Sequence, residues 1–349
     1  MASSPHVSWF AEIGLAERPH VGGKGGSLGE LQRAGIAVPP GFVVRTAAFE
    51  RFIATLEQRA AVRARVESLD PADLAGITAC SRELRARVEA GSLPADLQDE
   101  IAAAHAALCS DPAAPVAVRS SATTEDAADA SFAGLQDTYL WVQGAADVLH
   151  RLRSCWASLY SVESISYRRQ RGYPEQGVAM AVVVQRMVDA RSSGVMFTRS
   201  PTTGDRSVVT IEAAWGLGSA VVGGEVTPDR WVVSKITGEI SVRDISPKAI
   251  QHVPAAAGGV ESVPVAEALR SASSMSDEEL QKLRAIARQV ERHYGCPQDI
   301  EWAVQRDSNE ILLLQSRPET VWSTKDAAPA ARALDNPVAH VMSIFGGRR

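Results

Sequence analysis

Cysteine is scarce in this chain of 349 residues. The four cysteines, Cys80, Cys109, Cys155 and Cys296, are scattered, and no two of them form a C-x-x-C pair. This pattern argues against a disulfide framework and against a zinc site built on paired cysteines. We therefore expect a protein of a reducing compartment, the cytoplasm.

Long apolar runs are missing as well. No uninterrupted apolar stretch reaches the ~20 residues that a membrane helix requires, and the first ten residues lack the apolar segment of a secretion signal. An excess of positive charge is also absent, because 36 Lys and Arg face 41 Asp and Glu, for a formal net charge of -5. The expectation is a protein without nucleic-acid or membrane partners, in which any phosphate site is local.

The composition is otherwise that of an ordinary globular protein. Hydrophobic residues make up 45% of the chain and charged residues 22%, which gives no compositional case for disorder. The length favours two domains or two lobes around one cleft. We place an N-terminal lobe at 1–185, a C-terminal lobe at 186–322 and a tail or linker at 323–349.

The periodicity predicts the main elements. Ala, Arg, Glu and Leu at helical spacing predict a helical segment over 47–110, and one further helix is predicted over 146–171. A continuous β-branched run predicts a buried strand over 178–185. Pro, Ala and Gly predict a surface loop over 253–265, whereas Ser276 and Glu279 form a capping box that opens a helix reaching about Tyr294.

A glycine-dense stretch, predicted as a loop, surrounds Lys24 between Val21 and Gly26. Glycines let backbone N–H groups approach a phosphate, and a lysine adds the charge. The stretch is neither a Walker A loop, because Arg18 and Gly25 occupy required positions, nor a Rossmann fingerprint, because Leu28 replaces the third glycine. A flexible turn with a solvated lysine remains the alternative.

Arginine and hydroxyl side chains follow a short predicted strand at Arg119, Ser120 and Ser121, where side chains commonly converge on a ligand. A second candidate phosphate-covering loop contains Gly134 and Thr138. The alternatives are a surface ion pair for the arginine and an ordinary hairpin turn for the loop.

Two strands near the C-terminus, 298–304 and 310–315, carry Glu301 and Gln315. A carboxylate and an amide oxygen side by side suit Mg²⁺, and Arg317 lies on the same strand face as Gln315. A cross-strand polar pair at a sheet surface is the alternative for these residues.

Together these motifs resemble the nucleotide-binding domain shared by phosphoenolpyruvate synthase, pyruvate phosphate dikinase, rifampicin phosphotransferase and phenylphosphate synthase. The resemblance covers roughly 10–322 and rests on the collinear segments GGKGGSLGEL, VPPGFVV, VRSSATTED, SFAGLQDTYL, VVVQRMV, SGVMFTRSPTTGD, GLGSAVVGGEVTPD, DIEW and LQSRP. It implies an α+β, two-lobed ATP-grasp-like fold with ATP in the cleft between the lobes.

The resemblance also implies a role for each matched position. Lys24 and Arg119 would contact ATP phosphates, Gly134 and Thr138 would line the phosphate-covering loop, and Gln185 would lie beside the adenine. Glu301 and Gln315 would hold Mg²⁺ and ATP, and Arg317 would stabilise charge on the transferring group. Arg317, Lys24 and Arg119 are thus the catalytic candidates, and Leu135 and Ser219 depart from the residues common in the family.

The remaining expectation concerns the phosphoryl acceptor. None of the seven histidines has the sequence context of the family's phosphohistidine, and we expect no barrel domain for phosphoenolpyruvate after Arg317. The resemblance therefore implies a phosphotransferase subunit that passes the β-phosphoryl of ATP to a histidine on a separate, swivelling partner subunit, as in phenylphosphate synthase. The alternatives are an excised ATP-binding domain of a related synthase, dikinase or rifampicin phosphotransferase, and a non-catalytic nucleotide-sensing module.

Overall fold

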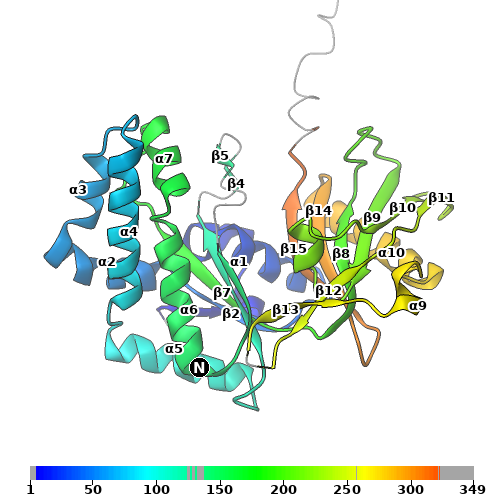
Figure 1. Ribbon diagram of the computed structural model, residues 1–349, viewed down its shortest axis with the longest axis horizontal. Helices are drawn as coiled ribbons and strands as arrows, with labels where there is room; N and C mark the ends of the chain where they lie inside the picture. Colours follow the sequence, from blue (N-terminus) through cyan, green and yellow to red (C-terminus); the bar gives the residue numbers. More distant parts are fainter. Residues whose placement is uncertain are drawn as a thin grey trace, which may run out of the picture.

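The computed structural model describes residues 5–123, 126–127, 130–131, 137–256, 258–320 and 322. Within them the chain builds two large β-sheets, each with its own helices, and two small hairpins, so the expected mixture of helix and sheet is confirmed. Figure 1 shows the helices α2–α7 on one side, the first sheet in the middle and the second sheet on the other side.

The first sheet has five strands in the order β1-β2-β7-β3-β6, and all its neighbours are antiparallel. Its strands are β1 (Val7–Trp9), β2 (Gly41–Val44), β3 (Val116–Ala122), β6 (Thr138–Val142) and β7 (Met180–Arg186). Strand β7 is buried over all but its last residue, which confirms the buried strand predicted from its β-branched run.

Helices surround this sheet. They are α1 (Arg18–Arg33), α2 (Thr46–Ala60), α3 (Val62–Glu67), α4 (Leu74–Ala90), α5 (Ala95–Leu108), α6 (Gly144–Ser158) and α7 (Val162–Arg171), with short 3-10 turns at Phe10–Glu12 and Leu15–Glu17. Helices α2–α5 confirm the predicted helical segment. The single helix predicted over 146–171 is wrong, because Ser161 accepts a hydrogen bond from the Ser164 N–H at 3.1 Å and starts α7 separately.

The second sheet has six strands in the order β11-β10-β9-β8-β14-β15. They are β8 (Ala190–Phe197), β9 (Val208–Trp215), β10 (Asp229–Ser234), β11 (Ile240–Asp244), β14 (Gln298–Gln305) and β15 (Ile311–Pro318). Its helices are α8 (Ser219–Val222), α9 (Glu267–Arg270) and α10 (Asp277–Tyr294), and the predicted capping box of α10 is confirmed.

Two small hairpins stand outside these sheets. They pair β4 (Asp126–Ala127) with β5 (Ala130–Ser131), and β12 (Ile250–Pro254) with β13 (Val260–Pro264). The second hairpin corrects the surface loop expected over 253–265. Its strands belong to neither large sheet and are mostly half-exposed, so they carry few of the apolar residues that make a strand recognisable.

Helix α1 packs against both sheets. Val21 and Leu28 lie in a core with Val43 and Val183 of the first sheet, whereas Leu31 lies in the core of the second sheet. The helix is therefore fixed from both sides, and the side chains on it are held between the sheets.

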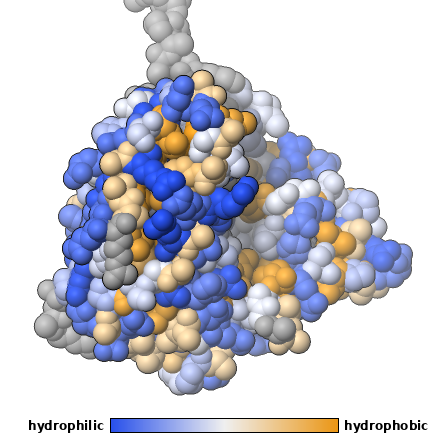
Figure 2. All heavy atoms as spheres, turned by 60° about the vertical axis from the view of Figure 1, so that its left-hand side comes forward, coloured by the Kyte–Doolittle hydropathy of each residue, from blue (hydrophilic) through white to orange (hydrophobic). Residues whose placement is uncertain are grey.

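The surface of the helical side is largely polar (Figure 2). Hydrophilic residues cover much of the helical face turned forward in Figure 2, and apolar residues are scattered among them. Among the helices of the described ranges, none combines the length and the hydrophobicity that crossing a bilayer requires. All four cysteines are free, as their scattered positions predict.

Candidate functional site

A cavity of about 650 Å³ lies between the two sheets, with α1, β3 and β7 contributing from one side and β8, β14 and β15 from the other. It brings together the predicted side chains that the structure describes: Lys24, Arg119, Thr138, Gln185, Glu301, Gln315 and Arg317. Gly134 and its neighbour Leu135 lie outside the described residues. Segments almost 300 positions apart in sequence thus meet at one site.

Lys24 owes its place to a kink in α1. The stretch Val21–Gly26, predicted as a loop, belongs to this helix and departs from helical geometry only at Gly22, whose φ is +71°. At the kink the Ser121 hydroxyl donates to the Val21 carbonyl at 2.9 Å and accepts from the Gly25 N–H at 3.1 Å. It thus stands between the two groups that an unbroken helix would join directly.

The hydroxyls of β3 therefore act on the backbone. Ser120 and Ser121 are completely buried, and Ser120 donates to the Asp137 carbonyl at 3.0 Å. The sequence suggested that these hydroxyls converge on a ligand; in the structure both donate to backbone carbonyls. Their role is to fix the strand that carries Arg119 against α1 and the start of β6.

Arg119 connects the two sheets. Its Nη1 donates to the Leu314 carbonyl at 2.8 Å, and its Nη2 donates to Glu301 Oε2 at 3.0 Å and to Gln315 Oε1 at 2.8 Å. The side chain is nine-tenths buried, and within the described residues its Nε has no hydrogen-bond partner. Since a guanidinium has five N–H donors, Nε–H and one Nη1–H remain for a ligand.

A β-bulge in β15 presents one of the three acceptors that Arg119 contacts. Glu301 pairs with Gln315 as the sequence predicts, but the next pair is Trp302 with Leu313, so Leu314 is an extra residue in β15. A bulge leaves the extra residue outside the regular ladder and re-aims its groups. The bulged Leu314 carbonyl is the one that accepts from Arg119, so the bulge presents an additional acceptor toward the cavity.

Asp299 is a cavity residue that the sequence reasoning missed. It lies two residues before Glu301 on β14, and its Oδ2 lies 3.4 Å from Arg317 Nε on the neighbouring strand. Burial raises the pKa of Asp299 to about 6, and the positive charge of Arg317 opposes this shift. Residues i and i+2 of a strand share a face, so the alternation in Asp299-Ile300-Glu301 was the available signal.

The oxygen atoms of this cluster suit a hard cation. Among the described residues there is no group of three His, Cys, Asp or Glu side chains that could hold a metal alone. Mg²⁺, however, is commonly bound through one or two carboxylates together with substrate phosphates. Asp299 Oδ1 is buried and has no hydrogen-bond partner within the described residues, and Glu301 and Gln315 lie beside it on β14 and β15.

Another part of the cavity wall is apolar. Val188, Ala190, Leu217 and Ala303 pack as one cluster, with Leu314 beside it. Gln185, which lines the same cavity, is almost completely buried and donates to the Pro39 carbonyl at 3.2 Å. An apolar wall with few fixed polar groups suits a flat heteroaromatic ring, and a charged cluster suits an anion.

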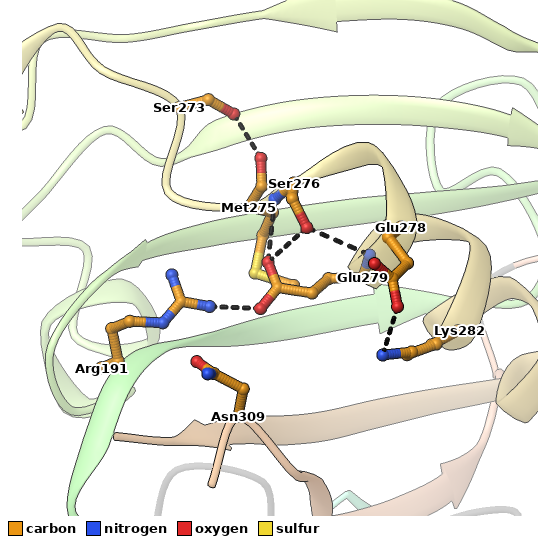
Figure 3. Close-up of a pocket in the computed structure, with 8 residues that line it drawn as sticks. All are labelled: Arg191, Ser273, Met275, Ser276, Glu278, Glu279, Lys282 and Asn309. Atoms are coloured by element: carbon orange, nitrogen blue, oxygen red, sulfur yellow. Dashed lines mark hydrogen bonds and ion pairs between the residues drawn. The ribbon is translucent and has the colours of Figure 1, made fainter. Parts of the chain in front are cut away.

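A second cavity, of about 640 Å³, lies at the start of α10 and is shown in Figure 3. Its charged groups bind one another: Arg191 pairs with Glu279, whose Oε2 also accepts from the Ser276 hydroxyl at 2.9 Å, and Lys282 pairs with Glu278 at 2.8 Å. These internal pairs leave no excess positive charge for a polyphosphate. The cavity between the sheets is therefore the stronger candidate.

Comparisons with known proteins identify relatives of this chain. "Probable phosphoenolpyruvate synthase" of Methanothermobacter thermautotrophicus is 42% identical over 318 residues, covering 90% of this chain and 46% of that protein. The protein of the same name from Methanocaldococcus jannaschii is 39% identical to this chain, and the match covers 91% of this chain and 27% of that protein. "Phosphoenolpyruvate synthase" of Pyrococcus furiosus is 35% identical, and the match covers 96% of this chain and 46% of that protein.

The chain thus spans less than half the length of each of these relatives. A family model described as "Pyruvate phosphate dikinase, AMP/ATP-binding domain" matches residues 18–336, which is most of the chain. The chain therefore belongs to the family of pyruvate phosphate dikinase AMP/ATP-binding domains.

Proposed function

We propose that this chain is the ATP-using half of a dikinase-type phosphotransferase. The observation that carries the proposal is the convergence of Arg119, Glu301 and Gln315 in one cavity, which Lys24 and Arg317 also line. Phosphoryl transfer depends on positioning and on electrostatic stabilisation, and cations around a carboxylate-and-amide cluster supply both. The two sheets then act as two lobes, 1–185 and 186–322, with ATP between them and 323–349 as a linker or tail.

Each predicted residue has a place in this proposal. The adenine lies against the apolar wall near Gln185, and the phosphates reach Lys24, Arg119 and Thr138, which is the first residue of β6 and lines the cavity. Glu301 and Gln315 would hold Mg²⁺, with Asp299 as a third oxygen ligand, and the ion would neutralise phosphate charge. Arg317 stabilises the charge that develops on the transferring group.

In the proposed reaction a histidine nitrogen of an acceptor becomes bonded to the β-phosphorus of ATP, and the bond between that phosphorus and the oxygen of the α-phosphate breaks, which releases AMP. Water attacks the γ-phosphorus, and the bond between the γ-phosphorus and the oxygen of the β-phosphate breaks, which releases phosphate. The balance is one ATP, one histidine and one water giving AMP, phosphate and phosphohistidine. We place the acceptor histidine on a separate, swivelling subunit, as in phenylphosphate synthase.

A second candidate differs only in the acceptor. The relatives are named phosphoenolpyruvate synthases and are more than twice as long as their shared segment, which favours a chain that acts within a phosphoenolpyruvate synthase. In that case the acceptor histidine lies on a further domain, and pyruvate is the final acceptor. The two candidates share the cavity and the transfer step.

The test uses ATP labelled at the β-phosphate, with Mg²⁺ and with or without the products of neighbouring genes. We expect acid-labile label on a histidine of one such product together with AMP, and none with Arg317→Ala. Pyruvate that discharges the label indicates the synthase, whereas a phenol indicates the other candidate. Absence of both label and AMP under every combination contradicts the proposal.

A further inference from the structure

One wall of the cavity is a glycine-rich segment with little stability of its own. The segment Gly216–Glu225 contains the four-residue helix α8, and Leu217, Ser219 and Val222 within it line the cavity. A single turn of helix is unstable in isolation, and glycines pay a large entropy cost when ordered. Leu217 and Ala220 are buried in small apolar clusters, whereas Val222 is 64% exposed, so apolar packing holds only part of the segment.

A single residue outside the segment holds it at three points. The Leu217 N–H donates to the His252 carbonyl at 2.9 Å. The His252 ring lies 2.8 Å from the Ser219 hydroxyl through Nδ1 and 3.3 Å from Glu225 Oε2 through Nε2. His252 thus contacts the beginning, the middle and the end of the segment, and it is nine-tenths buried.

The partners assign a role to each ring nitrogen. A carboxylate accepts only, so Nε2 carries the proton that is donated to Glu225, and Nδ1 of the neutral ring accepts from the Ser219 hydroxyl. Both ring nitrogens are thus occupied by the contacts with Ser219 and Glu225, and we call these three side chains the clamp. A histidine that serves as a phosphoryl acceptor needs one nitrogen available, so this geometry suits a holding role.

The clamp stands on a hairpin that reaches both sheets. His252 lies on β12, and at the turn of the hairpin the Gly259 N–H donates to the Trp141 carbonyl of β6 at 3.3 Å. Gly216 approaches so closely that an added Cβ would lie 2.4 Å from the His252 carbonyl oxygen. The cavity wall is therefore tied, through one strand, to the edge of the first sheet.

We propose that His252 is a positioning residue that holds Gly216–Glu225 in the conformation that forms the cavity wall. In its absence the segment samples open conformations, and the cavity loses affinity for the nucleotide. The effect on the nucleotide rests on the proposed function, whereas the effect on the segment does not.

The first measurement is amide hydrogen exchange of the full chain without nucleotide. In His252→Ala we expect exchange over 217–225 to be faster by about tenfold, because local opening becomes easier, with other segments unchanged. The matched control is His150→Ala, which removes an exposed histidine of α6. Unchanged exchange in His252→Ala overturns the proposal.

The second measurement is the affinity for ATP by calorimetry. We expect His252→Ala to weaken ATP binding by about tenfold while kcat changes less than about threefold. His252→Asn keeps an acceptor for Ser219 and His252→Gln keeps a donor for Glu225, so each should restore part of the affinity. If exchange accelerates but ATP affinity is unchanged, His252 does not position the ATP site.

The two measurements separate the possible failures. If the wild-type chain does not bind ATP, the proposed function fails, and the exchange comparison still decides whether His252 holds the segment. If His252→Ala does not fold, the Asn and Gln variants supply the same comparison. A double-mutant cycle with Glu225→Ala adds a further criterion, because the effects of two residues that act through one contact are not additive.

Discussion

At the scale of single residues, Arg119 joins the two sheets at the cavity. Its three hydrogen bonds end on a carboxylate, an amide and a carbonyl of β14 and β15, and it keeps two N–H groups for a ligand. A planar fork of five donors can do this, and a lysine ammonium cannot reproduce it.

Replacing Arg119 should therefore strongly slow phosphoryl transfer. We expect Arg119→Ala to lower the transfer rate at least about 100-fold, since it removes a cation from the reacting phosphates and a bridge between the sheets. Arg119→Lys should restore only a minor part. The control, Arg51→Ala, removes an exposed ion pair with Asp96 and should leave the rate unchanged. A wild-type rate in Arg119→Ala would show that the site lies elsewhere.

Asp299 gives a prediction about pH. Burial raises its pKa from 3.8 to about 6. Since the folded protein binds this proton more tightly than the unfolded chain does, stability falls as pH rises from 3.8 to about 6. Asp299→Asn, which cannot ionise, should raise the free energy of unfolding at pH 8 by about 1–3 kcal/mol, with little difference near pH 4.

Urea unfolding at the two pH values measures this difference. The control is Asp307→Asn, in the exposed turn between the same two strands, for which no pH-dependent difference is expected. An Asp299→Asn effect of equal size at both pH values would contradict the account. The same variant should weaken Mg²⁺-dependent ATP binding, so the carboxylate costs stability and serves the site.

The sequence indicates residue types at the site better than it indicates their partners. Glu301 and Gln315 could be paired from strand alternation alone. Ser121 could not be assigned, because its partners on α1 lie about 100 positions away and depend on how the helix packs across β3. Asp299 was within reach of the same alternation that pointed to Glu301.

At the scale of elements, the kink in α1 places Lys24 in the cavity. The close approach of α1 to β3 requires glycine, since a Cβ on Gly22 would lie 2.1 Å from the Ser121 carbonyl oxygen. The positive φ at Gly22 adds a second requirement for the same residue type.

Gly22→Ala should therefore be strongly destabilising. We expect a loss of about 3 kcal/mol or more in the free energy of unfolding, from backbone strain and a clash together. Gly172→Ala is a matched control, because Gly172 has φ +66° with nothing within 4 Å of an added Cβ, and it should cost about 1 kcal/mol. Equal losses in the two variants would show that the contact with Ser121 is unimportant.

Helices and strands could be predicted from the sequence where one hydrophobic pattern continued over many residues. The helices α2–α5 and the buried strand β7 have long uniform patterns, and the capping box fixed the start of α10. The hairpin of β12 and β13 and the break between α6 and α7 depend on a Gly-Gly turn and a serine cap. Such short signals are easily read as loop or as continued helix.

At the scale of the whole molecule, the cavity exists only because the two sheets face each other. Lys24 and Arg119 come from the first half of the chain, and Glu301, Gln315 and Arg317 come from its end. The net charge of -5 is therefore compatible with a phosphate site, since the cations are gathered locally. The fold class could be predicted from the collinear motifs, whereas the contact between β3 and β15 required the structure.

The most direct test of this account compares the affinities of ATP and AMP in the presence of Mg²⁺ by calorimetry. If the charged cluster binds the β- and γ-phosphates, ATP should bind at least about tenfold more tightly than AMP, and Arg119→Ala should remove most of that advantage without weakening AMP. Equal affinities for the two nucleotides, or an ATP advantage that Arg119→Ala leaves intact, would contradict the placement of the phosphates between the two sheets.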